Sequence, residues 1–400
     1  MRYPFIAGIA MAGQLLSLGL AFLFHFIMAR WLGVALYGEL GIFLGIFTLL
    51  FYPVIGVQAV LMREVAQLHA ESKLANIYWL IIHYFRQSLV ITLPFLALAL
   101  LALYLVGLLF HPFEILLLLL SVPMFYAIFV FNSYFQGTQQ PLQFASLLVS
   151  IDFLRLAVAV ILVGAGFQLM GIGLAYLLPA LLFFLPILLF FYRSHVRQAR
   201  PFSFSLLKHV RWVLPTYALL SLFLFIDLFF VRRLLTPEDA GIYNAALTLA
   251  RAVFYVSLGL MAAFLPQSSK LVQRAEQSRV FRYFALSVFL LFLFAITLFF
   301  LKTSLVVFLY GTLYTPSAGL LGILAFSMFF LATTFLFINF LWSRQVQKLP
   351  FYVSIIAVLL ALPLFYFLTL TYGIVGTAYA SLFSTAFFAL LTAAAVWKTL

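Results

Sequence analysis

The sequence predicts an all-α polytopic membrane protein with twelve transmembrane helices. Hydrophobic residues make up 67% of the 400 residues and charged residues only 8%, whereas soluble proteins carry about 25% charged residues. The apolar segments are continuous over about 20 residues, the length at which an α-helix crosses a bilayer. Membrane β-strands alternate polar and apolar side chains, so these continuous segments exclude a β-barrel.

Twelve apolar segments fit the length of a membrane span, and short polar turns separate them. The expected spans are 5–28, 39–61, 82–106, 113–134, 142–164, 171–192, 212–232, 242–265, 283–302, 317–341, 350–370 and 373–396. A proline inside a span frees a backbone carbonyl and permits the helix to bend. Pro94, Pro123, Pro179 and Pro363 lie inside spans.

Lysine and arginine are concentrated on one side of the expected membrane. Fifteen of the 22 lie in loops on one side, four lie in loops on the other, and three lie inside spans. Short loops rich in these residues stay in the cytoplasm, so we expect both termini to be cytoplasmic. The most basic loop, 193–211, holds five of them and no acid. The net charge of +13 therefore indicates topology and contact with anionic membrane lipids, and not nucleic-acid binding.

Two halves of the chain share short motifs at a constant offset. Gly38 matches Gly241 and Gly173 matches Gly376, both at an offset of 203 residues. Six spans per repeat is an even number, so the repeats are parallel and related by an axis along the membrane normal. Such repeats are typical of alternating-access transporters. The expected parts are an N-terminal six-helix bundle, a basic cytoplasmic linker and a C-terminal six-helix bundle, at 1–192, 193–211 and 212–400.

Five segments carry a resemblance to a known family. They are ARWLGVALYGELGIF (29–43), LMREVAQ (61–67), YFQGTQQPLQFASLLVSIDFLRL (134–156), VRRLLTPEDAGIYNAALTLA (231–250) and FLYGTLYTPSAGLLGILAFSMFF (308–330). Together they resemble the Wzx-like flippases of lipid-linked oligosaccharides, within the multidrug/oligosaccharidyl-lipid/polysaccharide exporter superfamily. The first repeat departs from the family pattern at Val34-Ala35-Leu36, where the family often has Pro-Glu-Glu.

The resemblance implies a fold and a function. It implies two six-helix bundles around a central cavity, in the cytoplasmic membrane of a bacterium or archaeon. It further implies alternating-access flipping of an undecaprenyl-diphosphate-linked oligosaccharide for cell-surface polysaccharide such as lipopolysaccharide or capsule. Polysaccharide-assembly proteins, and a monovalent cation or proton as coupling ion, are the further partners. The alternatives are an ion-coupled multidrug antiporter of the same superfamily and a membrane glycan polymerase or ligase.

Arginines inside the spans are candidate substrate ligands, because a buried charge costs about 2.5–3.5 kcal/mol on insertion scales and so requires a partner. Arg251 is expected to bind the diphosphate, since a guanidinium offers a planar fork of donors. Its alternatives are an inter-helix pair with Asp227 and contact with the membrane interface. Arg155 is a second candidate, with Asp152 three residues earlier on the same helical face. The alternative for this pair is simple self-neutralisation.

Two acids inside the spans are candidates for coupling transport to an ion. Asp227 in the seventh span is expected to bind a cation or to take up a proton. Its alternative is a structural pair with Arg232 or Arg233. Asp152 is the second ion-coupling or charge-pair candidate, and in this role it changes partner during transport.

Three more residues complete the candidate substrate site. Arg86, near the cytoplasmic end of the third span, extends to lipid phosphate or meets the substrate as it enters. His25 lies between phenylalanines and is either a packed side chain or a group that senses protonation. Arg30 follows it and is expected at the outer rim.

The sequence carries no motif for catalysis or for a bound cofactor. It has no cysteine, which excludes disulfides, thiol catalysis and cysteine-ligated metals. It also lacks the G-x-x-x-x-G-K motif that holds nucleotide phosphates. The expected outer loops are too short for a folded catalytic domain. We therefore expect a transporter, not an enzyme, with no cofactor and no metal.

Overall fold

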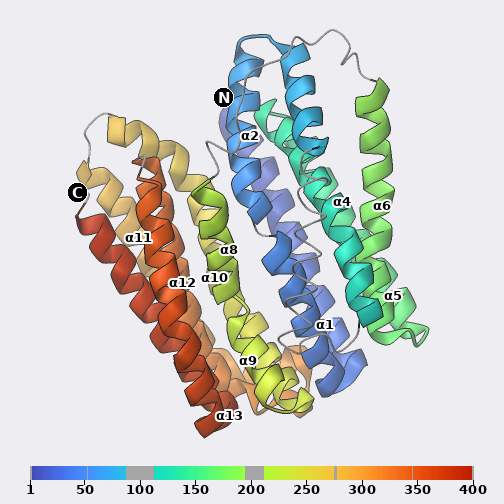
Figure 1. The fold of residues 1–400 in the computed structure, drawn as a ribbon, viewed down its shortest axis with the longest axis vertical. Helices are drawn as coiled ribbons and strands as arrows, with labels where there is room; N and C mark the ends of the chain where they lie inside the picture. Colours follow the sequence, from blue (N-terminus) through green and yellow to red (C-terminus); the bar gives the residue numbers. More distant parts are fainter. Residues whose placement is uncertain are drawn as a thin grey trace. The chain divides into compact units, whose positions relative to one another are not determined.

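The computed structural model describes residues 2–51, 53–86, 112–193, 211–273, 277–344 and 346–398, and they form helices and short turns (Figure 1). The named helices are α1 (Arg2–Phe51), α2 (Pro53–Ala70), α4 (Pro112–Gly137), α5 (Pro141–Gly164), α6 (Gln168–Arg193), α8 (Val213–Phe223), α9 (Ile226–Leu234), α10 (Pro237–Gln273), α11 (Gln277–Tyr310), α12 (Ser317–Ser343) and α13 (Lys348–Trp397).

The predicted all-helical membrane architecture is confirmed. Eight of the described helices are long and apolar enough to cross a membrane, or nine when the bent pair α8 and α9 counts as one span. Two of these nine contain two spans each, because α1 turns at Gly33 (φ 75°) and α13 turns at Gly373 (φ 60°). The third expected span, 82–106, lies mostly outside the described residues. The described helices fit the twelve-helix, two-lobe fold that the sequence predicts.

The chain forms two units, and the first is built on helices from the N-terminal half. Unit 1 comprises Met1–Leu32 and Ile46–Ala218. Within it α4 packs against α2 and α6, and α5 packs against α6. Rings of Phe47, Phe125 and Tyr176 pack edge to face in its core, with centroids 4.9–6.3 Å apart. The core of this unit is therefore aromatic and lies between α1, α4 and α6.

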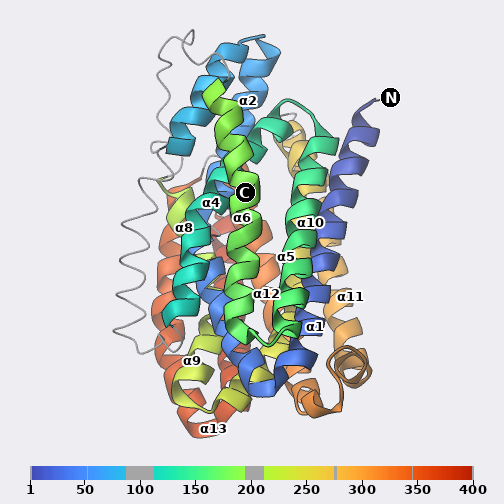
Figure 2. The ribbon, with the colours of Figure 1, turned by 90° about the vertical axis from the view of Figure 1, so that its right-hand side faces the viewer.

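Unit 2 comprises Gly33–Gly45 and Leu219–Leu400. Its central helix is α12, which lies beside α10, α11 and α13 (Figures 1 and 2). The helix α9 packs against α10 and α13. The expected basic linker falls almost wholly outside the described residues, since 194–210 are not among them.

A segment of thirteen residues from the first half of the sequence belongs to unit 2. In this segment, 33–45, a Cβ on Gly38 would lie 2.6 Å from the backbone nitrogen of Gly241, and a Cβ on Gly241 would overlap the carbonyl of Val34. Two backbones approach this closely only where neither residue has a side chain. The two glycines that match at an offset of 203 residues are thus in direct contact.

Candidate functional site

The predicted pair Asp152 and Arg155 forms in α5 of unit 1. One turn of helix separates the two residues, and Nη2 of Arg155 lies 2.8 Å from Oδ1 of Asp152. The side chain of Asp152 is 16% exposed and that of Arg155 is 13% exposed, so the pair is mostly buried but keeps some exposed surface. Oγ of Ser17 on α1 donates a hydrogen bond to the other carboxylate oxygen of Asp152. The carboxylate therefore has donors from two helices.

Aromatic rings hold the guanidinium of Arg155. Its Cζ lies 5.0 Å from the ring centroid of Tyr176 on α6 and 5.7 Å from that of Phe24 on α1. A cation over a ring face is attracted by the electron density of the ring. Three helices thus converge on one arginine, which is fixed in position while part of its surface remains exposed.

The seventh span, in contrast, is broken. The helices α8 and α9 meet at Leu224 and Phe225 with a bend of 46° (Figure 1). Phe225 has φ −140° and ψ −9°, which are not helical values. No proline or glycine lies at the break. Asp227 follows in the first turn of α9, where the helix dipole favours an acid.

Asp227 is fully buried at this position and accepts several hydrogen bonds. Its Oδ2 accepts from the hydroxyl of Tyr243 on α10 at 3.0 Å and from Oγ of Ser381 on α13 at 3.3 Å. Its Oδ1 accepts from the backbone N–H of Leu228 at 2.8 Å. Ser327 on α12 hydrogen bonds to Ser381 at 2.8 Å and extends the network. The site is a carboxylate within a group of hydroxyl oxygens.

Arg251 on α10 lies at the break itself. It is 3% exposed, and its Nε and Nη2 donate to the backbone carbonyl of Leu224 at 3.0 and 2.7 Å. Its Cζ lies 3.7 Å from the centroid of the Phe225 ring. The charges of Arg251 and Asp227 also attract each other. The role of Arg251 as a diphosphate ligand stays a prediction, and it requires the guanidinium to leave this carbonyl.

Arg232 has a different partner from the one considered for it. Its Nε and Nη2 lie 2.6 and 2.5 Å from Oε1 of Glu39, which is 8% exposed in segment 33–45. The alternative in which Asp227 pairs with Arg232 is therefore not what the structure shows. The same segment is held by Asn244, whose side-chain amide donates to the carbonyl of Tyr37 at 3.0 Å.

The remaining predicted residues are His25, Arg30 and Arg86, and all three are described in the structure. His25 is half-buried, and its ring packs edge to face on Phe24, the ring that also lies beneath Arg155. Arg30 is exposed near the turn at Gly33. Arg86 is exposed at the last described residue before 87–111. The structure thus brings His25 near the Arg155 site and leaves the other two on the surface.

Sequence reasoning missed four polar partners of the two acids and of Arg232. Ser17, Tyr243 and Ser381 are uncharged polar residues within spans, and Glu39 follows a tight turn. Nothing in their local sequence separates them from other serines and tyrosines of the spans. Within the described part of the chain, no group of three His, Cys, Asp or Glu residues is placed to hold a metal ion.

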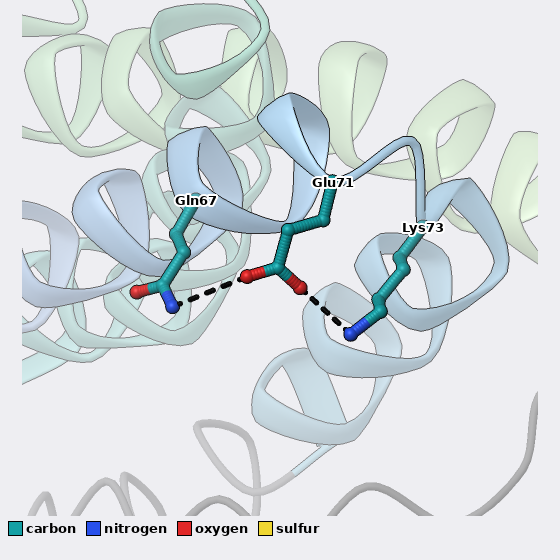
Figure 3. Close-up of polar contacts among 3 residues, drawn as sticks. All are labelled: Gln67, Glu71 and Lys73. Carbon is teal, nitrogen blue, oxygen red and sulfur yellow. Dashed lines mark hydrogen bonds and ion pairs between the residues drawn. The ribbon is translucent and has the colours of Figure 1, made fainter.

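An exposed ion pair lies outside the spans, just after α2 (Figure 3). Nζ of Lys73 lies 2.7 Å from Oε2 of Glu71. The side-chain amide of Gln67 donates to the other carboxylate oxygen of Glu71 at 3.4 Å. The hydrogen bonds from Lys73 and Gln67 lower the pKa of Glu71 below its usual value. This pair provides a solvent-exposed reference for the buried ones.

Sequence comparison identifies the family. The profile of the polysaccharide biosynthesis protein family matches residues 7–272. This range includes Asp152 with Arg155 and Asp227 with Arg251. The chain belongs to this family. The MatE family profile matches residues 213–367. The predicted resemblance is confirmed, and the chain is a membrane transporter of the MOP superfamily. No curated protein is similar enough in sequence to count as a match.

Solved structures of similar fold are MOP-superfamily transporters. An inward-facing multidrug resistance MATE transporter matches with a TM-score of 0.72 at 15% identity, over 98% of both chains. The eukaryotic MATE transporter AtDTX14 has a TM-score of 0.72 at 15% identity, over 98% of this chain and 94% of that one. A MOP-superfamily transporter from Pyrococcus furiosus, with a binding pocket of reversed polarity, has a TM-score of 0.69 at 14% identity, over 98% and 95%. At these identities the likeness shows the fold.

Proposed function

We propose that this transporter flips an undecaprenyl-diphosphate-linked oligosaccharide from the cytoplasmic to the outer leaflet by alternating access. The observation that carries the proposal is Arg155, a mostly buried guanidinium held over two rings with part of its surface exposed. A planar guanidinium binds phosphate oxygens through two parallel hydrogen bonds. The polysaccharide biosynthesis family match covers this residue.

In this proposal Asp152 holds Arg155 until the substrate arrives. Its carboxylate has a second donor in Ser17, so it keeps a partner when a diphosphate takes over the guanidinium. His25, beside Phe24, lies next to the same site. Arg86 and Arg30 are exposed, and they meet the charged headgroup before and after it crosses. The bias of basic loops supports cytoplasmic termini.

Asp227 is the coupling group in this proposal. A carboxylate with hydroxyl neighbours provides the oxygen ligands that hard cations prefer. Ser381, Ser327 and Tyr243 supply those hydroxyls within one hydrogen-bonded network. Sodium is therefore the first coupling ion to test, and a proton is the alternative.

A multidrug antiporter is the second candidate, and the MatE match over residues 213–367 favours it. Such a transporter of cationic drugs needs an acid that is free to pair with the drug. In the described spans Asp152 already pairs with Arg155, and Asp227 is fully buried, out of reach of a molecule the size of a drug. The charges therefore favour an anionic substrate over a cationic one.

The experiment is a flipping assay in proteoliposomes with a fluorescent lipid-diphosphate oligosaccharide. Arg155→Ala is expected to slow flipping by about tenfold or more, because a charge-assisted contact to phosphate is lost. Arg155→Lys keeps the charge but not the fork, so it recovers only part of the rate. Arg344→Ala is the matched control, since Arg344 also lies over a ring, that of Phe340.

Two outcomes would count against the proposal. Flipping at the wild-type rate in Arg155→Ala would remove this residue from the substrate site. Exchange of a cationic dye for sodium, with no flipping of the lipid, would instead establish the antiporter.

A further inference from the structure

At the break in the seventh span, a backbone donor and a backbone acceptor that would pair in a continuous helix bond to charged side chains instead. In a continuous helix the N–H of Leu228 would donate to the carbonyl of Leu224. Here that N–H donates to Asp227, and that carbonyl accepts from Arg251. No hydrogen bond joins Leu228 to Leu224 in the described part of this span.

Three neighbouring N–H groups donate to backbone carbonyls close by in the chain. Leu224 and Phe225 donate to the carbonyls three residues earlier, at 3.2 and 3.1 Å. Phe229 donates to the carbonyl of Phe225 at 3.1 Å, the normal helical spacing. Of the backbone groups at the break, the N–H of Leu228 and the carbonyl of Leu224 are the ones that bond to charged side chains.

The two charges need each other as well as the backbone. Asp227 is 0% exposed and Arg251 is 3% exposed, so neither reaches solvent. A backbone carbonyl without a donor is costly inside a bilayer, and the guanidinium supplies two donors to the carbonyl of Leu224. The stack of Arg251 on Phe225 fixes the second residue of the break.

We propose that Arg251 is a positioning residue. It maintains the break in span 7 and so places the carboxylate of Asp227 where it can bind the coupling cation. This inference rests on the proposed coupling role of Asp227. When Arg251 is absent, the carbonyl of Leu224 is left without its donors, and the nearest replacement is the N–H of Leu228. That N–H then leaves Asp227, the span straightens, and the carboxylate turns away from Ser381 and Tyr243.

Substitutions of Arg251 are expected to differ in their effect on the break, because they remove different parts of its contact with Leu224 and Phe225. Arg251→Leu removes both donors and the charge. Arg251→Lys keeps a positive charge that reaches the carbonyl as a point donor, but it lacks the fork and stacks less well on Phe225. Lys302→Leu is the matched control, because it removes a cation that lies 4.4 Å from the ring centroid of Phe299 on its own helix, α11.

The first measurement is the length of the span. The chain contains no cysteine, so Arg211→Cys and Arg233→Cys, both exposed, give a spin-label pair at the two ends of span 7. Straightening a 46° bend over this length increases the end-to-end distance by about 2–3 Å at 1.5 Å per residue. We expect this increase in Arg251→Leu, a smaller one in Arg251→Lys, and none in Lys302→Leu. An unchanged distance in Arg251→Leu would overturn the proposal.

The second measurement is sodium binding, by radioactive sodium and by sodium-dependent thermal stabilisation of the full chain in nanodiscs. Arg251→Leu is expected to weaken sodium binding by about tenfold or more, as loss of a supporting residue does at metal sites. A longer span with unchanged sodium affinity would also overturn the proposal. A wild-type protein that does not bind sodium would refute the sodium-coupling role of Asp227, and the spin-label distance alone then decides whether Arg251 holds the break.

Discussion

The acid–arginine pair in unit 1 and the one in unit 2 use the same residue types in different ways. Asp152 and Arg155 are three residues apart on one helix and bond directly at 2.8 Å. Asp227 and Arg251 lie on different helices, and the backbone from Leu224 to Leu228 lies between them. The first pair is 16% and 13% exposed at its side chains, whereas the second is almost completely buried.

The different partners of the two arginines determine which of them can bind a substrate. The donors of Arg155 are shared with one carboxylate on its own helix, and an incoming phosphate can compete for them. Two donors of Arg251 bind a carbonyl that has lost its helical partner, so displacing them leaves that carbonyl unsatisfied in the membrane interior. The partial exposure of Arg155 therefore favours a role in substrate binding. The buried bond from Arg251 to a backbone carbonyl favours a structural role.

The largest effect that would sharpen this contrast is on stability. Arg251→Leu is expected to lower the free energy of unfolding by about 3 kcal/mol, because it leaves a buried carboxylate without its countercharge. Arg155→Leu is expected to lower it by about 1 kcal/mol, since Asp152 keeps the hydroxyl of Ser17 and some contact with solvent. The measurement is reversible unfolding of each variant in micelles, followed by the fluorescence of the five tryptophans. Equal losses in the two variants would contradict the contrast.

The next effect concerns the hydroxyl groups that support each acid. Ser381→Ala is expected to cost about 2 kcal/mol, because it removes a donor to a buried charge and the partner of Ser327. Ser17→Ala is expected to cost about 1 kcal/mol, since Arg155 still neutralises Asp152. The same unfolding measurement tests both, and the double variants Ser381→Ala with Asp227→Asn and Ser17→Ala with Asp152→Asn give the coupling in each unit. A larger coupling energy between Ser17 and Asp152 than between Ser381 and Asp227 would contradict the view that the buried acid depends more on its hydroxyl partners.

The sequence predicted the spans well because burial in a bilayer imposes long apolar runs that are visible residue by residue. It also predicted the pair Asp152 and Arg155, since a spacing of three residues determines that two side chains share a helical face. The broken span was not predictable in this way. Prolines were expected to mark bent helices, yet α4 and α6 continue through Pro123 and Pro179, while the break at Leu224 has no proline.

The missed contacts have a common physical cause. The partner of Arg251 is a backbone carbonyl, which every residue carries and no sequence pattern marks. The partner of Arg232 is Glu39, 193 residues earlier in the chain. Contacts of this range depend on how segment 33–45 folds into unit 2. The offset between Gly38 and Gly241 was readable, but their direct contact follows only from the fold.

The smallest expected effect is at the exposed pair Glu71 and Lys73, which serves as the solvent reference for both buried pairs. Because the pKa of Glu71 is lowered in the folded protein, the pair stabilises the fold above the usual carboxyl pKa. That contribution fades as the pH falls through the lowered value, where both folded and unfolded forms become protonated. Solvent screens an exposed pair, so Glu71→Gln is expected to leave the melting temperature unchanged within error between neutral and mildly acidic pH. The measurement is the melting temperature of wild type and variant in nanodiscs at a series of pH values. A gap between the two curves as large as that for Arg155→Leu would mean that exposure does not set the strength of these pairs.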